Sequence, residues 1–391
     1  MTHLAVTDDN VEEMYFGDKK ARWYQITSMH QVEDAFVNQG AQRVCLVSPT
    51  GSGKSNMSGM ICNSLVIRKF CGVSNELDHN GHYKENLRVL FVAHRDRLLQ
   101  QAVVTYAAAN GVELITQSMF SDIPVGVIER GWHLTIFDES HHESCNNFQY
   151  KLEQLTQNPK NALGFIPLIG MTATPDRADG MLIKFDIIVT AISREQAVAE
   201  GWLAETYLYS FVDPTNRANK VPMLTDIFEH YHQQMGRGIA FVATKAEASE
   251  LTDNIRRVTG KRTFNAVDVS DAVLNKVLDD FSLGQWDFIV NCGKLGEGVD
   301  VKGCESVILG ESVNSFPKLS QIVGRASRPD SDCRIFEMVN PLRDNLDTTV
   351  IVGEPKCHKL IYKRSGKWVE REFDYSTLQV DDSFDLSANR L

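Results

Sequence analysis

The stretch SPTGSGKS at residues 48–55 decides how the rest of this chain is interpreted. It has the spacing of a phosphate-binding loop, except that Ser48 stands where glycine is usual. The apolar run at residues 43–48 predicts a strand before the loop, and a helix is expected to begin near Lys54. Glycines allow backbone N–H groups to converge on a polyphosphate, and the N-terminus of the helix adds partial positive charge. We therefore expect ATP or GTP to bind here.

The side chains of the loop predict how the nucleotide is held. Lys54 is expected to reach the β- and γ-phosphates, and the Ser55 hydroxyl is expected to coordinate Mg²⁺. The expected nucleotide-binding residues of the loop are Thr50, Gly51, Ser52, Gly53, Lys54 and Ser55.

An acidic pair follows the apolar run LTIFD at residues 134–138. Asp138 ends the predicted strand, a position from which a carboxylate can hold Mg²⁺ directly or through water. The adjacent Glu139 can orient and deprotonate an attacking water molecule, as a general base does. The pair therefore predicts a nucleotide-hydrolysing site together with the phosphate-binding loop.

The stretch QIVGRASR at residues 321–328 is the third chemical signal. If it is helical, Gln321, Gly324, Arg325 and Arg328 share one face, because they stand at i, i+3, i+4 and i+7. A glycine within a helix costs about 1 kcal/mol relative to alanine, which indicates a close approach by another group. Two arginines on one face can clamp a γ-phosphate in the transition state. A solvated basic face is the plainer alternative.

The pattern along the chain predicts an α/β fold. Nearly continuous apolar runs are typical of parallel strands buried on both faces, and strands that alternate with helices imply right-handed crossovers. Strands are expected at residues 43–48, 88–93, 134–138 and 167–172, and in a second set at 238–243, 287–291, 306–309 and 333–339. Helices are expected from Lys54 and at residues 96–109, 245–259 and 271–281.

Two such sets of strands predict two tandem domains, each with a parallel sheet covered by helices. The C-terminal hairpin is expected to turn at Ser365-Gly366. The arginine pair is far in sequence from the phosphate-binding loop, so we expect the two to come from different domains. A nucleotide site between the domains would be completed only when the domains close, and nucleotide hydrolysis would then be coupled to domain motion. The expected parts are an N-terminal segment at 1–20, a nucleotide-binding domain at 21–195, a second domain at 196–350 and a hairpin with a tail at 351–391.

The composition bounds the class of protein. The 391 residues are 43% apolar and 23% charged, which is ordinary for a well-packed globular protein. The net charge of −11 neither favours nor excludes nucleic acid, because binding depends on a local basic surface. The eight cysteines include no CxxC pair, and His141, His142 and Cys145 lack a second ligand pair, so neither a zinc site nor a disulfide scaffold is expected. With no long apolar run and no signal-peptide pattern, we expect an intracellular protein, cytoplasmic or nuclear, without a membrane partner.

Four motifs together resemble those of the superfamily 2 helicases and translocases. They are SPTGSGKS, DESH, TATP and QIVGRASR, which begin at residues 48, 138, 172 and 321 and occur in the order found in that family. The resemblance covers residues 20–345, nearly the whole chain. It implies two RecA-like domains, with ATP bound in the cleft between them and a nucleic acid strand that crosses both.

The resemblance also implies roles for single residues. Gln25, at the end of RWYQ, is expected to recognise adenine, which favours ATP over GTP, and Asp300 is expected near the ribose or the γ-phosphate. Arg325 and Arg328 match the finger positions, with Gln321 as a phosphate sensor. This chain departs from the family at Cys292, where many members have a phosphate-binding threonine. The expected nucleic-acid contacts are His94, Arg95, Thr116, Gln117, Ser118 and Thr244.

Three stretches favour DNA as the substrate. HRDRLLQQA, DESH and TATPDRADG resemble the DNA-acting branches, namely restriction-type translocases, excision-repair helicases and branch-migration enzymes. RNA-acting DEAD-box proteins usually differ in the fourth residue of DESH and carry a SAT-like triplet. We expect an ATP- and Mg²⁺-dependent helicase or translocase that acts on single-stranded, duplex or branched DNA, in repair or recombination. Two alternatives stay open: an RNA helicase, and a nucleic-acid-binding clamp or complex subunit with a vestigial ATPase.

Overall fold

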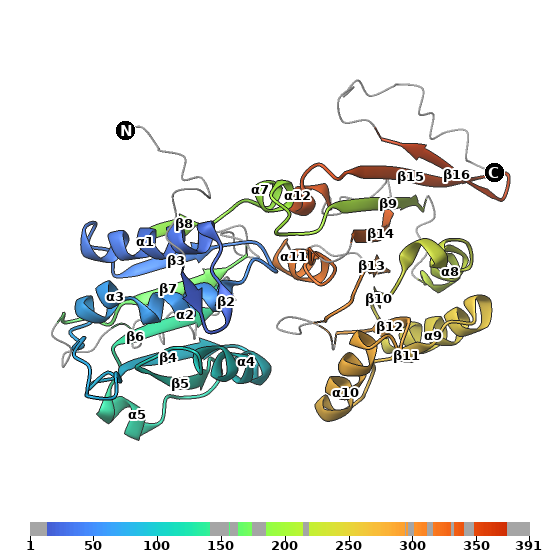
Figure 1. Ribbon diagram of the computed structural model, residues 1–391. Helices are drawn as coiled ribbons and strands as arrows, with labels where there is room; N and C mark the ends of the chain where they lie inside the picture. The colour runs from blue at the N-terminus through green and yellow to red at the C-terminus, as the bar shows by residue number, and fades with distance from the viewer. Residues whose placement is uncertain are drawn as a thin grey trace. The chain divides into compact units, whose positions relative to one another are not determined.

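The computed structural model describes residues 14–140, 156, 163–173, 185–213, 219–293, 295, 301–310, 316–329, 332–339 and 348–373. The chain divides into two compact units, each built around one large sheet (Figure 1). Unit 1 comprises Met1–Ala204, Lys294–Lys302 and Val313–Asp330, and unit 2 comprises Glu205–Gly293, Gly303–Ser312 and Ser331–Leu391. The segment that holds the predicted arginine pair thus belongs with the phosphate-binding loop in unit 1.

The sheet of unit 1 has six strands, all paired in parallel. In spatial order they are β5 (Val112–Ser118), β4 (Leu87–Ala93), β6 (Leu134–Asp138), β7 (Leu168–Thr172), β3 (Arg43–Val47) and β8 (Ile187–Thr190). The helices of the unit include α1 (Trp23–Val37), α2 (Lys54–Asn63), α3 (Leu65–Phe70), α4 (Asp96–Tyr106), α5 (Val125–Arg130), α7 (Arg194–Ala199) and α11 (Phe316–Val323). The short strands β1 (Tyr15–Phe16) and β2 (Lys19–Lys20) pair with each other. The four predicted strands of this unit are confirmed, whereas β5 and β8 were not predicted.

The sheet of unit 2 has eight strands, and β16 alone runs antiparallel to its neighbour. In spatial order they are β11 (Thr263–Asn265), β12 (Phe288–Asn291), β10 (Gly238–Phe241), β13 (Ser306–Leu309), β14 (Cys333–Val339), β9 (Thr206–Val212), β15 (Cys357–Arg364) and β16 (Lys367–Glu372). The helices of this unit are α8 (Val221–Met235), α9 (Lys245–Thr259), α10 (Asp271–Ser282) and α12 (Thr349–Val352), within the part of the chain that the structure describes. The predicted strands and helices are confirmed to within two residues at either end, and β9 and β11 were not predicted.

Each sheet is buried by apolar side chains from its strands and from the helices packed on it. In unit 1 the largest fully buried apolar side chains include Tyr24, Phe36, Leu46, Met57, Ile61 and Phe137. In unit 2 they include Phe211, Phe228, Phe281, Phe288 and Phe336. The continuous apolar runs seen in the sequence therefore correspond to strands covered on both faces. None of the described helices has both the length and the apolar character needed to cross a bilayer.

The C-terminal hairpin of β15 and β16 extends the sheet of unit 2, since β15 pairs in parallel with β9. Its turn falls at Ser365-Gly366, both with positive φ, as predicted. The Trp368 ring packs edge-on against Phe211, with centroids 5.4 Å apart. This tryptophan therefore packs within unit 2, and the hairpin forms the edge of its sheet.

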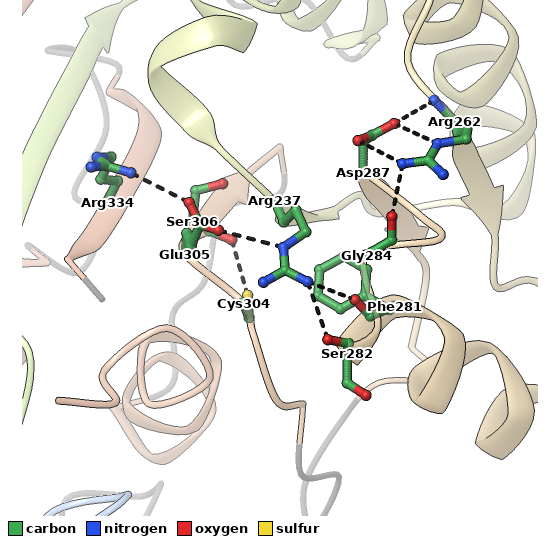
Figure 2. A network of polar contacts seen from close by, with 10 residues as sticks. All are labelled: Arg237, Arg262, Phe281, Ser282, Gly284, Asp287, Cys304, Glu305, Ser306 and Arg334. Carbon is green, nitrogen blue, oxygen red and sulfur yellow. Dashed lines mark hydrogen bonds and ion pairs between the residues drawn. The ribbon is translucent and has the colours of Figure 1, made fainter. Parts of the chain in front are cut away.

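A polar network closes the amino ends of the parallel strands of unit 2 (Figure 2). Arg237 precedes β10; its guanidinium donates to the Phe281 carbonyl oxygen at 3.0 Å and pairs with Glu305 at 3.4 Å. Arg262 pairs with Asp287 at 3.2 Å, and this contact lowers the pKa of the aspartate despite its partial burial. These arginines satisfy carbonyl groups at helix and strand ends, so they serve the fold and lie at the edge opposite the carboxyl ends of the strands.

A buried arginine organises the polar segment between α3 and β4. Arg68 lies on α3 and is fully buried, and its guanidinium carbon is 3.9 Å from the centroid of the Tyr83 ring. Burial lowers the pKa of this guanidinium. Its N–H groups donate to the carbonyl oxygens of Ser74, Glu85 and Gly111 and to Oδ1 of Asn75, at 2.7–3.2 Å. The polar segment between α3 and β4 is thereby tied to the body of unit 1.

Replacing Arg68 with leucine should lower the free energy of unfolding of unit 1 by about 3 kcal/mol, because four partly buried hydrogen bonds from a buried guanidinium group are lost. Urea denaturation followed by circular dichroism measures the change as a lower midpoint. Lys69→Leu is the matched control, since Lys69 is the exposed neighbour on the same helix. Equal midpoints for the two variants would mean that the Arg68 contacts contribute nothing.

Candidate active site

The candidate nucleotide-binding and catalytic residues of unit 1 lie at or after the carboxyl ends of strands that end at one edge of its sheet. The phosphate-binding loop follows β3, Asp138 ends β6, and Thr172 ends β7. These strands are parallel and lie in the order β6-β7-β3, so their carboxyl ends come together. This edge is where ligands bind in open parallel sheets.

The phosphate-binding loop is held in shape by its own serines. Gly51 and Gly53 have φ of +90° and +92°, which side chains rarely adopt, and Gly53 caps α2. The hydroxyls of Ser48 and Ser52 lie 2.5 Å apart, and the Ser52 hydroxyl donates to the Pro49 carbonyl oxygen at 2.7 Å. Ser48, the departure from the usual glycine, is thus used as an internal brace.

The Lys54 ammonium group reaches back over the loop. Its Nζ donates to the Ser48 carbonyl oxygen at 3.2 Å. The Ser48 N–H in turn donates to the Thr172 carbonyl oxygen at 3.0 Å, which joins the loop to the end of β7. Ser55 follows Lys54 in the first turn of α2 and is exposed. The loop thus lies between the end of β3 and the start of α2, which is the strand and helix context that the sequence predicts.

The first turn of α1 rests on the phosphate-binding loop. The Gln25 amide nitrogen donates to the Ser52 carbonyl oxygen at 3.1 Å, and the Gln25 amide oxygen accepts the Arg22 N–H at 3.0 Å. A Cβ atom on Gly53 would lie 2.6 Å from the same amide nitrogen. The Tyr24 hydroxyl donates to the Ser52 carbonyl oxygen at 2.7 Å. Gln25 is therefore in direct contact with the phosphate-binding loop. Tyr24 was not predicted as a site residue, and the one feature of the sequence that could have indicated it is its position next to Gln25.

The acidic pair is buried at the end of β6. Asp138 and Glu139 are both buried, and the Glu139 N–H donates to the Asp138 carboxylate at 3.1 Å. Glu139 has φ of +52°, a left-handed conformation that is uncommon for a residue with a side chain. The chain thus turns sharply where the predicted base stands.

The charge of the acidic pair fits a cation. Burial and the neighbouring charge of Glu139 raise the pKa of Asp138 to about 7, whereas Lys54 acts to lower it. Two adjacent buried carboxylates repel each other, and a divalent cation relieves both the desolvation and the repulsion. Asp138, with the Ser55 hydroxyl, is therefore suited to hold the Mg²⁺ that accompanies a nucleotide.

The segment with the arginines contacts the phosphate-binding loop within unit 1. A Cβ atom on Gly324 would lie 2.3 Å from Cγ2 of Thr50, so only glycine fits against this threonine. The Ser327 carbonyl oxygen accepts the Ala204 N–H at 3.2 Å, and the Ser327 hydroxyl accepts from Arg194 at 3.1 Å. The close approach expected at Gly324 is confirmed.

The helix expected through residues 321–328 is shorter than predicted. Helix α11 ends at Val323, so the prediction that Arg325 and Arg328 share a helical face with Gln321 is wrong. The Arg325 N–H bonds to the Ile322 carbonyl oxygen three residues back, which tightens the chain into a turn after Gly324. Gln321 and Arg325 are buried, and Arg328 is partly exposed beyond the turn.

The remaining predicted residues fall at several places. His94 and Arg95 follow β4, and Thr116, Gln117 and Ser118 end β5, at the same edge of the sheet as the phosphate-binding loop. In unit 2, the Thr244 hydroxyl accepts the Glu247 N–H at 3.2 Å and caps α9, so its observed role is local. Asp300, Thr174, His141, His142 and Cys145 lie outside the described residues.

Two family models match the chain, one in each half. Residues 18–122 match the res subunit of type III restriction enzymes, and residues 219–330 match the helicase conserved C-terminal domain. Among curated relatives, IRC3 of Saccharomyces cerevisiae, assigned as an ATP-dependent helicase, is 23% identical over 359 residues. This similarity covers 78% of the present chain and 50% of IRC3, so the chain spans about half the length of that relative.

Two solved structures share the fold. The type ISP restriction-modification enzyme LlaBIII, bound to DNA, has a TM-score of 0.62 at 16% identity, and the similarity covers 89% of this chain and 32% of that one. Mss116p, bound to single-stranded RNA and AMP-PNP, has a TM-score of 0.56 at 14% identity, with 82% of this chain and 73% of that one covered. At these identities the likeness concerns the fold.

The fold and the family models define an α/β protein with two RecA-like domains. Each half of the chain thus matches a family model of the helicase type, and the chain is similar to the superfamily 2 helicases and translocases.

Proposed function

We propose that this chain uses ATP and Mg²⁺ to move along DNA or to remodel it, including branched DNA. The observation that carries the proposal is the meeting of Lys54, Asp138 and Glu139 at one edge of the unit 1 sheet, next to a loop with the geometry of a phosphate site. The intact acidic pair favours an active motor over a clamp with a vestigial ATPase. Repair and recombination are the processes in which such a motor would act.

The hydrolysis step is assigned to the residues of this edge. Mg²⁺, when bound with the nucleotide, neutralises charge that develops on the β- and γ-phosphates. Lys54 is placed to hold the same phosphates once its contact with the Ser48 carbonyl oxygen is exchanged for them. Glu139 orients the attacking water and accepts its proton. Gln25 and Tyr24 link nucleotide binding in the loop to helix α1, because both side chains donate to the Ser52 carbonyl oxygen in the loop.

The arginines are assigned to the transition state. Arg325 and Arg328 follow Gly324, whose backbone packs against Thr50 of the phosphate-binding loop. A guanidinium group presents a planar fork of donors that matches phosphate oxygens. We assign Arg328 as the finger because it is partly exposed, whereas Arg325 is buried.

The choice of DNA is supported by the family model that matches residues 18–122 and by the DNA-bound state of LlaBIII. Mss116p has a similar fold and is bound to RNA, so the fold by itself is compatible with either nucleic acid. The motifs that resemble restriction-type and repair enzymes favour DNA.

The steady-state ATPase rate should rise severalfold with single-stranded, duplex or forked DNA and remain at its basal value with RNA. A coupled ADP-release assay measures the rate, with Glu139→Gln as the blank for contaminating ATPases. Stimulation by RNA alone would reverse the choice of substrate and leave the catalytic assignments in place. A rate that no nucleic acid changes would favour the clamp interpretation.

A further inference from the structure

Phe120, in the turn after β5, is the most exposed large aromatic side chain among the residues that the structure describes. Its exposed fraction is 72%, compared with 58% for Tyr15 and 43% for Phe373. Exposed apolar residues are common on protein surfaces, so the exposure alone carries little weight. The geometry of the turn and its position on the sheet are what suggest a function for Phe120.

The turn that carries Phe120 is held from inside by Gln117. This glutamine is only 6% exposed, and its amide nitrogen donates to the Ser118 carbonyl oxygen and the Ser121 hydroxyl, both at 2.8 Å. The same nitrogen lies 3.1 Å from the Ser121 carbonyl oxygen. The Phe120 N–H donates to the Ser118 hydroxyl at 3.3 Å. Gln117 is thus a positioning residue, and it presents the phenyl ring on a fixed turn, which reduces the entropy lost when a ligand binds.

The register of the sheet places this turn beside the expected nucleic-acid contacts. Strand β4 pairs with β5 so that Ala93 is opposite Ser118, and the Met119 N–H continues the ladder to the Ala93 carbonyl oxygen at 2.9 Å. Phe120 therefore leaves the sheet next to the point where His94 and Arg95 leave it, as the neighbouring carboxyl ends of β4 and β5 show (Figure 1). Phe120, Arg95 and Ser118 thus all stand at the carboxyl ends of two neighbouring strands.

We propose that Phe120 is a stacking platform for a base of single-stranded nucleic acid bound along the carboxyl edge of the unit 1 sheet. Proteins that hold single strands combine basic groups that follow the backbone with aromatic rings on which bases stack. Arg95 supplies the charge and Phe120 the ring. The inference rests on the proposed function and adds a contact with the base to contacts that otherwise involve only the backbone.

A protein surface is the competing occupant of this region. Val125 and Ile128 on α5 are also exposed and stand three residues apart on that helix. The residues of the turn itself are mostly polar, since Ser118, Ser121 and Asp122 surround Phe120 in sequence. An aromatic ring in a mostly polar turn, at the edge of the sheet where Arg95 also follows its strand, fits a base better than it fits an apolar partner face.

The test measures the affinity for a fluorescein-labelled oligothymidylate by anisotropy, in the presence of AMP-PNP and at fixed salt. Phe120→Ala should raise Kd about tenfold, Phe120→Leu nearly as much, and Phe120→Trp little, because the aromatic face is what the base contacts. Val104→Ala is the matched control, since Val104 is 77% exposed on α4 and should leave Kd unchanged. Thermal melting of each variant checks that it is folded.

A second readout reports stacking directly. The fluorescence of 2-aminopurine placed in the oligonucleotide should be quenched by the wild-type protein and less so by Phe120→Ala at saturating protein. If the wild type binds the strand and Phe120→Ala matches it in both Kd and quenching, the stacking role is overturned and the proposed function stands. If the wild type binds no nucleic acid and none stimulates its ATPase, the proposed function itself fails.

Discussion

Replacing Glu139 with glutamine should lower the steady-state rate of ATP hydrolysis by about 10²–10⁴-fold, the range that a positioned general base supplies. The amide keeps the size of the side chain but cannot accept a proton from water. The Glu139 N–H, which donates to the Asp138 carboxylate, is unchanged by the substitution, so we expect the turn after β6 to be kept. The rate is followed by release of inorganic phosphate under saturating ATP and Mg²⁺.

Nucleotide binding separates this outcome from simple misfolding. Glu139→Gln should still bind a fluorescent ATP analogue, because the phosphate-binding loop and Lys54 are untouched. Glu129→Gln is the matched control, since Glu129 is exposed on α5 and should hydrolyse ATP at the wild-type rate. Unchanged turnover in Glu139→Gln would show that another group activates the water.

Replacing Arg328 with alanine should lower ATP hydrolysis by about 10³-fold, the effect of removing an arginine that stabilises charge on the transferred phosphoryl group. Arg328 lies just beyond the turn at Gly324, the point at which this segment contacts Thr50 of the phosphate-binding loop. Arg328→Lys should restore little, because an ammonium group lacks the planar fork of the guanidinium. Single-turnover hydrolysis measures the chemical step.

The control for this experiment is Arg257→Ala, an exposed arginine on α9 that should leave hydrolysis unchanged. ATP affinity should change far less than the rate, since a finger acts mainly in the transition state. A loss of less than tenfold in Arg328→Ala would remove it from the transition state and would move attention to the buried Arg325.

Strands with a continuous apolar run were recognisable from the sequence, whereas β5, β8, β9 and β11 were not. The runs LTIFD, SVIL and CRIFEMV match β6, β13 and β14 because both faces of these strands are buried. Strand β5 (VELITQS) lies at the edge of its sheet and mixes polar with apolar residues, so its period is weak. The short edge strand β11 was missed for the same reason.

The sequence by itself determined the parts of the site that are local in the chain. The spacing of glycines, Lys54 and Ser55 encodes the loop because backbone N–H groups and one helix terminus, all within eight residues, form it. The place of Asp138 at the end of an apolar strand was equally local. Only the tertiary structure decided how distant segments meet this loop: Tyr24 and Gln25 donate to the Ser52 carbonyl oxygen, and Gly324 packs against Thr50. The tertiary structure also decided that α11 ends at Val323 and that the Gln117 side chain is buried beneath the turn that carries the exposed Phe120. Both features depend on which atoms pack around a residue, and the spacing of residues in the sequence does not contain this information.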